Sequence, residues 1–356
     1  MAIDNGGANV YHDGQMKLWK VTLICALSAL FVWLFLRRVD FGEIRGIWRA
    51  IPLRYPLLFL LLSLPQYAMR SYRWGLLLRP FKKRVPFRSL WNYSLIGFMI
   101  SYLLPGRLGE VARPVMLAEK ERIKKSQAIA TIVNERLFDL LSVLLLLAAY
   151  LASGAARPSP LLGRLRAAAF LLLPLVFLVF FLVILANSRR FFPWTEKLVR
   201  GASRLLPGRW RERGSSSAIH FVRALRLDLG WGGIAAVAAC SLLHWGIILF
   251  SYWLLMQGFS GIRLSLPSVV PFLAVIFVSA AVPTPGMAGS LDLASKYALT
   301  GLFAVADKTA VAFTILFHFL LLLAPISLGL AALWSEGLGF KAVRRLGKED
   351  ELPAMR

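Results

Sequence analysis

The chain has little cysteine and few acidic residues, and each shortage excludes a class of protein. Its two cysteines, Cys25 and Cys240, lie alone in apolar segments, so the sequence holds no disulfide framework and no paired metal-ligand motif. It also contains no Gly-x-x-x-x-Gly-Lys-Ser/Thr phosphate loop, no His-Glu-x-x-His pair and no Gly-x-Ser-x-Gly elbow. We therefore expect no cofactor, no metal ion and no catalytic residues of these types.

Apolar sequence is abundant instead. Hydrophobic residues make up 58% of the 356 residues, and the mean hydropathy is +0.65. Several apolar runs reach the roughly 20 residues that a helix needs to cross a hydrocarbon core of about 30 Å. The first run has no small-residue cleavage site after it and is predicted to be a retained anchor. We predict an all-α polytopic membrane protein with membrane segments at about 18–36, 56–78, 89–104, 127–152, 167–187, 230–257, 268–284 and 309–334.

Positive charge is in large excess, with 42 Lys and Arg against 18 Asp and Glu and a formal net charge of +24. Most of the basic residues lie in the connections beside the predicted helices, where anionic lipid attracts each of them by about 1 kcal/mol. We therefore expect membrane lipids as partners and no nucleic acid. If segments 89–104 and 268–284 enter the membrane and return to the same side, the basic residues gather more strongly on one side, which predicts cytoplasmic termini.

One sequence frame occurs twice, as Pro105-Gly106-Arg107-Leu108-Gly109 and as Pro285-Gly286-Met287-Ala288-Gly289, 180 residues apart. Proline and glycine break helices, and broken backbone at membrane depth is tolerated only where protein buries it or where it lines a wet cavity. Two breaks at matching places in two halves point to a transport site built from an internal repeat. We predict about six spanning helices and two re-entrant helical hairpins in an inverted repeat.

The repeat extends beyond the two breaks and sets the predicted organisation. Gln127-Ala128-Ile129-Ala130 matches Thr309-Ala310-Val311-Ala312 at an offset of 182, and the same offset aligns Arg136 with His318. The predicted single membrane domain, 1–356, divides into a first repeat half, a linking helix with a basic amphipathic cytoplasmic segment, a second repeat half and a cytoplasmic tail, at 18–152, 153–229, 230–335 and 336–356.

Charged residues gather in the first half. Glu135 and Asp139 are one helical turn apart and share a face, with Arg136 beside them. A charge at membrane depth costs about 3 kcal/mol or more, so such residues normally pair or face water. Either the arginines bind a phosphate or another anionic headgroup while the acids hold them in place or carry a proton, or the acids and Arg136 form a structural clamp between helices.

The second half offers fewer charges. Asp292 and Lys296 are one turn apart, as a local ion pair or as substrate contacts, and His318 either relays protons or joins two helices. Arg70 and Arg73 are expected to extend toward the membrane interface, and the alternative is that they bind a headgroup. The predicted substrate-binding set is Arg107, Glu110, Arg113, Glu135, Arg136, Asp139, Asp292, Lys296 and His318; the predicted hairpin breaks are Pro105, Gly106, Gly109, Pro285, Gly286 and Gly289.

Three motifs together carry a family resemblance. These are Leu104-Pro105-Gly106-Arg107-Leu108-Gly109-Glu110 with Arg113, then Glu135-Arg136-Leu137-x-Asp139, then Pro283-Thr284-Pro285-Gly286-x-x-Gly289. In these motifs the chain resembles the lysylphosphatidylglycerol synthetase transmembrane-region family over roughly residues 18–335. The family tends to have more glycine and then Glu after the second break, where this chain has Met287-Ala288 and Asp292.

The resemblance implies a flippase-like protein of a bacterial or archaeal inner membrane, with two re-entrant hairpins in inverted arrangement. It implies amphiphilic cargo such as aminoacyl-phospholipids or polyprenyl-phosphate-linked glycolipids. The synthetases carry an aminoacyl-transferase domain after the membrane region, and this sequence ends soon after its last predicted helix, so we expect a stand-alone membrane domain. The alternatives are a membrane glycosyltransferase or lipid-modifying enzyme, and a regulatory partner subunit of a lipid-biosynthetic enzyme. A homo-oligomer and a separate lipid-modifying enzyme both stay open as partners.

Overall fold

The computed structural model describes residues 26, 29–35, 41–104, 107–153, 160–187, 197, 201, 229–282 and 284–337. All regular structure in these residues is helical, which confirms the all-α prediction. The first two break residues, Pro105 and Gly106, lie outside the described residues, as do most of the linking segment and the tail beyond residue 337. The predicted domain boundaries stay predictions.

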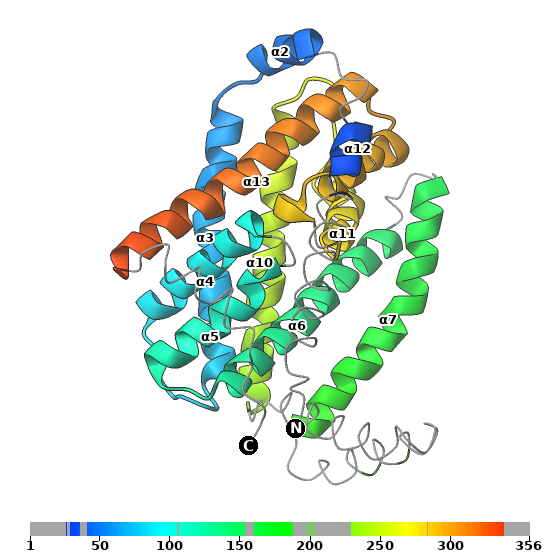
Figure 1. Ribbon diagram of the computed structural model, residues 1–356. Helices are drawn as coiled ribbons and strands as arrows, with labels where there is room; N and C mark the ends of the chain where they lie inside the picture. The colour runs from blue at the N-terminus through cyan, green and yellow to red at the C-terminus, as the bar shows by residue number, and fades with distance from the viewer. Residues whose placement is uncertain are drawn as a thin grey trace, which may run out of the picture.

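Four long helices form the centre of the fold. α10 lies beside α3, and α13 crosses the shorter α4, Phe87–Leu103, while α7 lies at the outer edge next to α6 (Figure 1). The four long helices have 25 to 29 residues, and they can be this long because their sequences are mainly apolar and contain few helix-breaking residues. Their bounds are Arg54–Leu78 for α3, Lys125–Ala152 for α6, Trp231–Gln257 for α10 and Asp307–Ser335 for α13; α7 is Pro160–Asn187 and α2 is Phe41–Arg49.

Within the described residues, α10 and α13 are each long and apolar enough to cross a membrane alone. α2 and α3, which are bent by 78° against each other, make a third span if they are counted as one. α6 is as long, but Glu135, Arg136 and Asp139 lie inside it. The apolar helices are those of a helical membrane protein.

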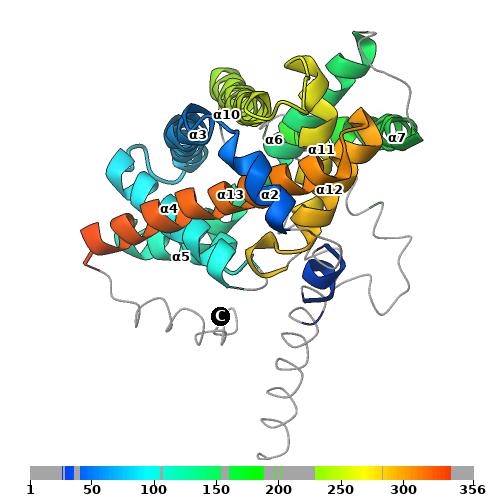
Figure 2. The same cartoon turned by 90° about the horizontal axis from the view of Figure 1, so that it is seen from above.

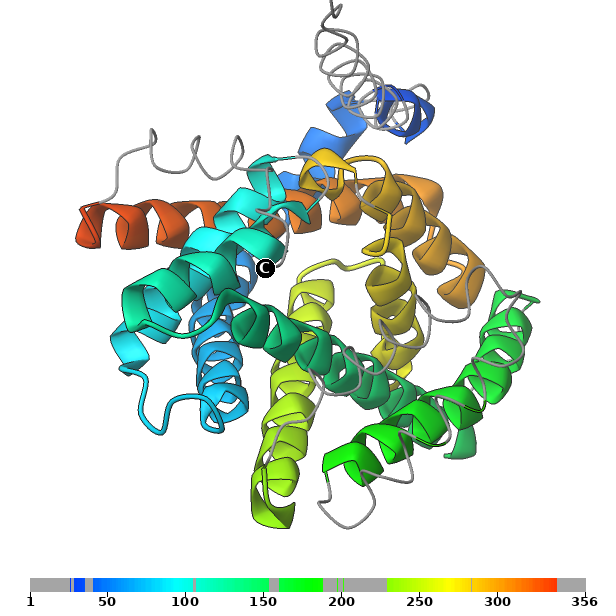
Figure 3. The ribbon, with the colours of Figure 1, turned by 60° about the horizontal axis from the view of Figure 1, so that its bottom comes forward.

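Two pairs of shorter helices complete the fold. The first pair is α4, Phe87–Leu103, with α5, Gly109–Glu121; the second pair is α11, Val270–Ser279, with α12, Ser290–Phe303. In each pair the two helices pack on each other, and the pairs lie to the two sides of α10 (Figure 2 and Figure 3). Short 3-10 helices precede α11 and α12, at Pro267–Val269 (η2) and Pro285–Met287 (η3).

In the first pair, the backbones of α4 and α5 approach each other closely at two glycines. A Cβ added at Gly97 would lie 2.6 Å from the Cβ of Arg113, and a Cβ added at Gly109 would lie 1.8 Å from the carbonyl oxygen of Gly97. Only glycine permits this approach, and small residues at helix contacts are the usual means of close packing inside membranes. The contact places α5, and therefore Arg113, against α4.

The two breaks share an unusual backbone conformation. Arg107 and Met287, 180 residues apart, have positive φ angles of 55° and 60°. Arg122 and Ala304, 182 residues apart, end α5 and α12 in the left-handed region, with φ of 55° and 53°. Non-glycine residues rarely adopt these angles unless the surrounding structure holds them there. The same bends therefore recur at nearly the same offset as the sequence repeat.

The helix bounds agree with the sequence in most places. Predicted segments 56–78, 89–104, 127–152, 230–257 and 309–334 match α3, α4, α6, α10 and α13 to within two residues at each end. The segment predicted at 167–187 begins earlier, because α7 starts at Pro160. The segment predicted at 268–284 is shorter, because α11 ends at Ser279 and the chain turns before the second break. Only residues 26 and 29–35 of the predicted first segment are described.

Candidate functional site

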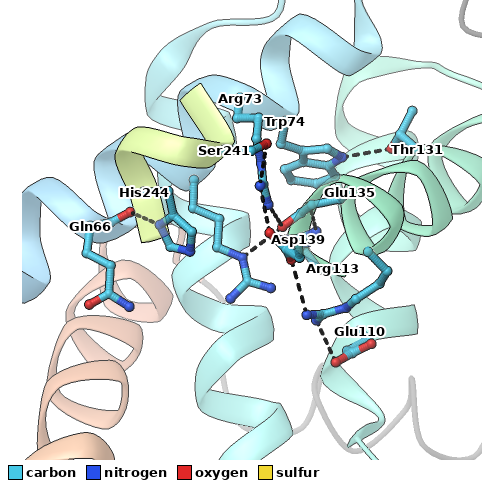
Figure 4. A network of polar contacts seen from close by, with 12 residues as sticks. Gln66, Arg73, Trp74, Glu110, Arg113, Thr131, Glu135, Asp139, Ser241 and His244 are labelled. Atoms are coloured by element: carbon cyan, nitrogen blue, oxygen red, sulfur yellow. Dashed lines mark hydrogen bonds and ion pairs between the residues drawn. The ribbon is translucent and has the colours of Figure 1, made fainter. Parts of the chain in front are cut away.

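A buried carboxylate on α6 is the centre of the polar site. Glu135 lies 2.7 Å from Nε of Arg70 and 3.1 Å from Nη2 of Arg73, both on α3. Its second oxygen accepts a hydrogen bond of 2.5 Å from Nη2 of Arg113 on α5. Glu135 and Arg73 are both fully buried. Three helices are therefore joined through one carboxylate, as the close-up in Figure 4 shows.

Asp139, one turn further along α6, extends the network to α10. Nη1 of Arg73 donates to its Oδ1 at 2.6 Å, and the indole nitrogen of Trp245 donates to the same oxygen at 3.1 Å. Nη1 of Arg73 also donates to Ser241 at 2.9 Å. Arg136 reaches the other carboxylate oxygen at 3.5 Å. Both acids of the α6 face are thus engaged by arginines.

A third carboxylate lies nearer to solvent. Nη2 of Arg136 donates to Glu110 at 2.6 Å, and Arg107 donates to the same oxygen at 3.3 Å. The side chains of these residues are between 28% and 36% exposed, in contrast to the buried acids of α6. This outer group therefore connects the buried network to the open side of the site.

Aromatic rings flank two of the arginines. The guanidinium carbon of Arg113 lies 4.5 Å from the ring centroid of Trp74, and that of Arg70 lies 4.2 Å from the ring of Phe98. The indole of Trp74 is itself held by a hydrogen bond to Thr131 at 2.9 Å. Flat stacking suits guanidinium groups better than ammonium groups and fixes their plane. The arginines are therefore held in place before any ligand arrives.

A cavity of about 430 Å³ opens beside this network. Its wall includes residues of both helix pairs and of α3, α6, α10 and α13. The polar part of the wall is formed by Gln66, Arg70, Ser101, Tyr102, Arg107, Glu110, Arg113, Arg136, Asp139, His244 and Thr284. The apolar part comes mainly from α10 and α11. Such a mixture suits a ligand with a charged head and apolar tails.

The cluster of Arg70, Arg73, Arg107, Arg113 and Arg136 with Glu110, Glu135 and Asp139 is not neutral. Five arginines face three carboxylates, which leaves two positive charges unbalanced. Nε and Nη1 of Arg113 have no hydrogen-bond partner in the described part of the chain, although the side chain is only 2% exposed. Buried donors normally have partners, so these two N–H groups are left to donate hydrogen bonds to an anionic ligand.

A second acid–base contact lies at the second break. Nδ1 of His318 is 2.7 Å from Oδ1 of Asp292, and Nε2 is 2.8 Å from the carbonyl oxygen of Gly286. The other oxygen of Asp292 accepts a hydrogen bond from the backbone N–H of Gly289 at 2.8 Å. One carboxylate thus holds both the start of α12 and the imidazole of α13.

The two halves repeat this contact at one register. Glu110 pairs with Arg136 and Asp292 pairs with His318, and each acid precedes its base by 26 residues. The offset between the two pairs is 182 for both members, which is the offset found in the sequence. We call these two contacts the repeat pairs. In each of them an acid in the first turn of a short helix binds a base on the following long helix.

Two sequence predictions about contacts are wrong. Asp292 and Lys296 do not form a local ion pair, because Lys296 lies 2.9 Å from Asp307 while Asp292 binds His318. Arg70 and Arg73 do not extend to the interface, because the acids of α6 bind them inside the protein. The alternative of a clamp between helices describes part of the α6 network correctly.

The remaining predicted residues divide into two groups. Arg107, Glu110, Arg113, Glu135, Arg136 and Asp139 come together around the cavity, whereas Asp292 and His318 lie at the second break and Lys296 lies further along α12, where it binds Asp307. His244, on α10, contacts the carbonyl oxygen of Gln66 at 3.3 Å and lines the cavity.

The predicted substrate-binding set contains no residue of α3 or α10, although a headgroup role for Arg70 and Arg73 is an alternative to an interfacial position. Arg70 and Arg73 are three residues apart in one helix, and Glu135 and Asp139 are four residues apart in another, so the members of each pair share a helix face. That pattern was a usable signal for a buried ion-pair ladder. Trp245 gave no such signal. Among the described residues, no group of three or more His, Cys, Asp or Glu side chains is placed to hold a metal ion.

Comparison with known proteins identifies the family of the chain. A family model described as the lysylphosphatidylglycerol synthase transmembrane region matches residues 21–329. A UPF0104 membrane protein of Methanocaldococcus jannaschii is 24% identical over 127 residues, which are 35% of this chain and 38% of that protein. The match therefore spans less than half of the relative's length. No solved structure matches the chain. The chain belongs to the lysylphosphatidylglycerol synthase transmembrane-region family of membrane proteins.

Proposed function

We propose that this chain is a lipid transporter, or flippase, that moves an anionic or zwitterionic lipid across the inner membrane of a bacterium or archaeon. The observation that carries the proposal is the 430 Å³ cavity, which both helix pairs line and which holds more arginine than carboxylate. An aminoacyl-phospholipid or a polyprenyl-phosphate-linked glycolipid has the matching chemistry, since each joins a phosphate to long apolar chains.

The charge of the site supports a phosphate ligand. Two positive charges stay unbalanced in the arginine cluster, and Arg113 keeps two buried donors free. Guanidinium groups bind phosphate through paired hydrogen bonds, and the aromatic rings beside Arg70 and Arg113 fix the planes of those groups. The apolar wall from α10 and α11 would leave the tails in contact with nonpolar surface.

We further propose that the helix pairs are re-entrant hairpins within an inverted repeat of about six spanning helices. The recurrence of positive φ at Arg107 and Met287 supports this, as does the equal offset of the repeat pairs. Inverted repeats with broken helices near the midplane provide alternating access to one site. The distribution of basic residues supports cytoplasmic termini.

Transport is favoured over catalysis by the state of the carboxylates. Glu110, Glu135 and Asp139 each accept contacts from arginines, so none is held ready as a general base. A lipid-modifying enzyme would then be a separate partner, and a second copy of the chain is another proposed partner. The proposal includes no cofactor.

A reconstitution assay tests the function. Purified protein in proteoliposomes is given fluorescent or mass-tagged lipids that differ only in headgroup, and their movement between leaflets is followed. The Arg107→Ala and Arg136→Ala variants should slow the transported lipid by about tenfold or more, since each removes a charged contact. Arg88→Ala, at an exposed position of α4 outside the cavity wall, is the matched control and should be unaffected. Absence of movement for every headgroup, with correctly folded protein, would reject the proposal.

A further inference from the structure

The repeat pairs differ in one chemical respect. In the first half the base is Arg136, and arginine is the basic side chain that stays charged in proteins. In the second half the same register holds His318, and imidazole is the side chain that gains and loses a proton near neutrality. The fold therefore contains one permanent and one titratable version of the same contact.

The surroundings of His318 require an extra proton. Its two ring nitrogens face two oxygens, one from the Asp292 carboxyl at 2.7 Å and one from the Gly286 carbonyl at 2.8 Å. A neutral imidazole has a single N–H and can donate to only one of them. Both contacts form together only when one more proton is present, on the ring or on the Asp292 carboxyl. The geometry thus describes the protonated state of the pair.

Few other charged groups lie on the elements packed against the pair. On α12 and α13, Lys296 and Asp307 bind each other at 2.9 Å. Lys308 binds Glu43 on α2. α4 contributes the backbone of Tyr102 near Gly286, and the described parts of α11 and η3 carry no charged residue.

α3 and α7 also pack on these helices, and Arg70 and Arg73 of α3 bind the acids of α6. The other basic residues of α2, α3, α4 and α7 are exposed, namely Arg45, Arg49, Arg54, Arg88, Arg164 and Arg166. Within the described residues, no partner other than Asp292 and Gly286 contacts the His318 ring nitrogens.

The break that His318 holds is conformationally strained. Gly286 and Met287 both have positive φ, at 59° and 60°. A non-glycine residue keeps such an angle only while tertiary contacts impose it. The break also reaches the cavity of about 430 Å³, because Met287 lines it. Leu291, next to Asp292, and Leu321, three residues after His318, line the same cavity.

We propose that Asp292 and His318 form a proton-binding site that holds the second break closed. When the proton leaves, one of the two contacts of His318 is lost, Gly286 is released, and the wall of the cavity at Met287 becomes mobile. Given the transport function proposed above, on which this step alone rests, proton release would couple to lipid movement. The proton site itself does not depend on that function.

The Asp292→Asn variant separates the effect of the proton from the effect of the hydrogen bonds of His318. In the Asp292→Asn variant the amide oxygen accepts from Gly289 N–H, and the amide nitrogen donates to His318 Nδ1. Neutral His318 then donates from Nε2 to Gly286, so every contact forms without an extra proton. This variant should keep the break closed at all pH values. His318→Ala should leave it open at all pH values, and Asp307→Asn is a control acid nearby.

Two measurements test the site in the full chain in lipid nanodiscs. Nitrogen-15 NMR of labelled histidine, assigned by the loss of signals in His318→Ala, should show both His318 nitrogens titrating in one step between about pH 5 and about pH 9. Alkylation of a Met287→Cys variant, with Cys25 and Cys240 replaced by serine, should become about tenfold faster as the proton leaves, because a charged hydrogen bond is lost.

The results separate the site from the transport function. Flat labelling in Asp292→Asn with a pH-dependent rate in wild type and Asp307→Asn supports the proposal. Ring nitrogens of His318 that do not change over this range, or equal pH dependence of labelling in wild type and Asp292→Asn, would overturn it. If titration and labelling behave as expected while no lipid moves in proteoliposomes, the proton site stands and the proposed transport function fails.

Discussion

The close backbone contact between α4 and α5 at Gly97 predicts that the Gly97→Ala variant is less stable. The added Cβ would lie 2.6 Å from the Cβ of Arg113 and 3.0 Å from the carbonyl oxygen of Gly109. Carbon atoms pack at about 3.5–4.0 Å, so the helices must separate by about 1 Å. Rotation of the side chain cannot relieve the clash, because Cβ is fixed to the backbone.

The magnitude follows from two opposing effects. Overpacking of this kind typically costs about 1–3 kcal/mol, whereas replacing a helical glycine by alanine gains at most about 1 kcal/mol. We expect a net loss of about 1–2 kcal/mol in the free energy of unfolding. A shift of α5 would also disturb the position of Arg113, whose Nη2 donates to Glu135 at 2.5 Å.

The assay compares two identical substitutions. Gly246 on α10 has no atom within 4 Å of an added Cβ, so Gly246→Ala should be neutral or slightly stabilising. Unfolding of both variants in mild detergent, followed by tryptophan fluorescence, measures the difference, and lipid movement in proteoliposomes measures its effect on the site. Equal stability of the two variants, together with unchanged transport by Gly97→Ala, would refute the close-contact reasoning.

Two further substitutions test Glu135, which is buried, and Glu336, which directly follows α13. Glu135→Gln leaves three arginines without their shared anion and should destabilise the protein by roughly 3–5 kcal/mol in chemical unfolding, whereas Glu119→Gln, in an exposed ion pair, should change little. Burial acts to raise the pKa of Glu336, but the Asn92 amide and the Lys120 ammonium outweigh it and hold that pKa below its ordinary value. The stabilisation from Glu336 is therefore complete above the ordinary pKa of about 4.3 and is lost as the pH falls through the lower folded value, so acid should lower the melting temperature of wild type more than that of Glu336→Gln.

The sequence predicts the long helices well because their signal is local. The range 230–257 is apolar throughout and bounded by glycine, and α10 occupies Trp231–Gln257. The second break was equally visible, since Pro285 and Gly286 interrupt an apolar run and η3 forms there. Element positions of this kind depend on residues that are close together in the chain.

The partners within the site could not be predicted in the same way. The sequence around Arg73 alone predicts an interfacial position. Its contact with Asp139 forms because α3 packs against α6. Likewise, Lys296 follows Asp292 by one turn, but α13 supplies closer partners for both. These choices depend on helix crossings between residues far apart in sequence, where periodicity carries no information.

The left-handed corners at Arg122 and Ala304 have a mechanical consequence. Each corner joins a short helix to a long one, and a repeat pair ties the far part of the short helix to the long helix it leads into. The short helix and the long helix are thus joined at two places, the corner and the repeat pair. They can change their angle to each other only if the repeat pair breaks. In the first half the repeat pair contains a guanidinium, which stays charged, so α5 stays fixed on α6. In the second half the repeat pair contains an imidazole, so under the proton-binding proposal α12 is the helix that can move relative to its long partner, α13.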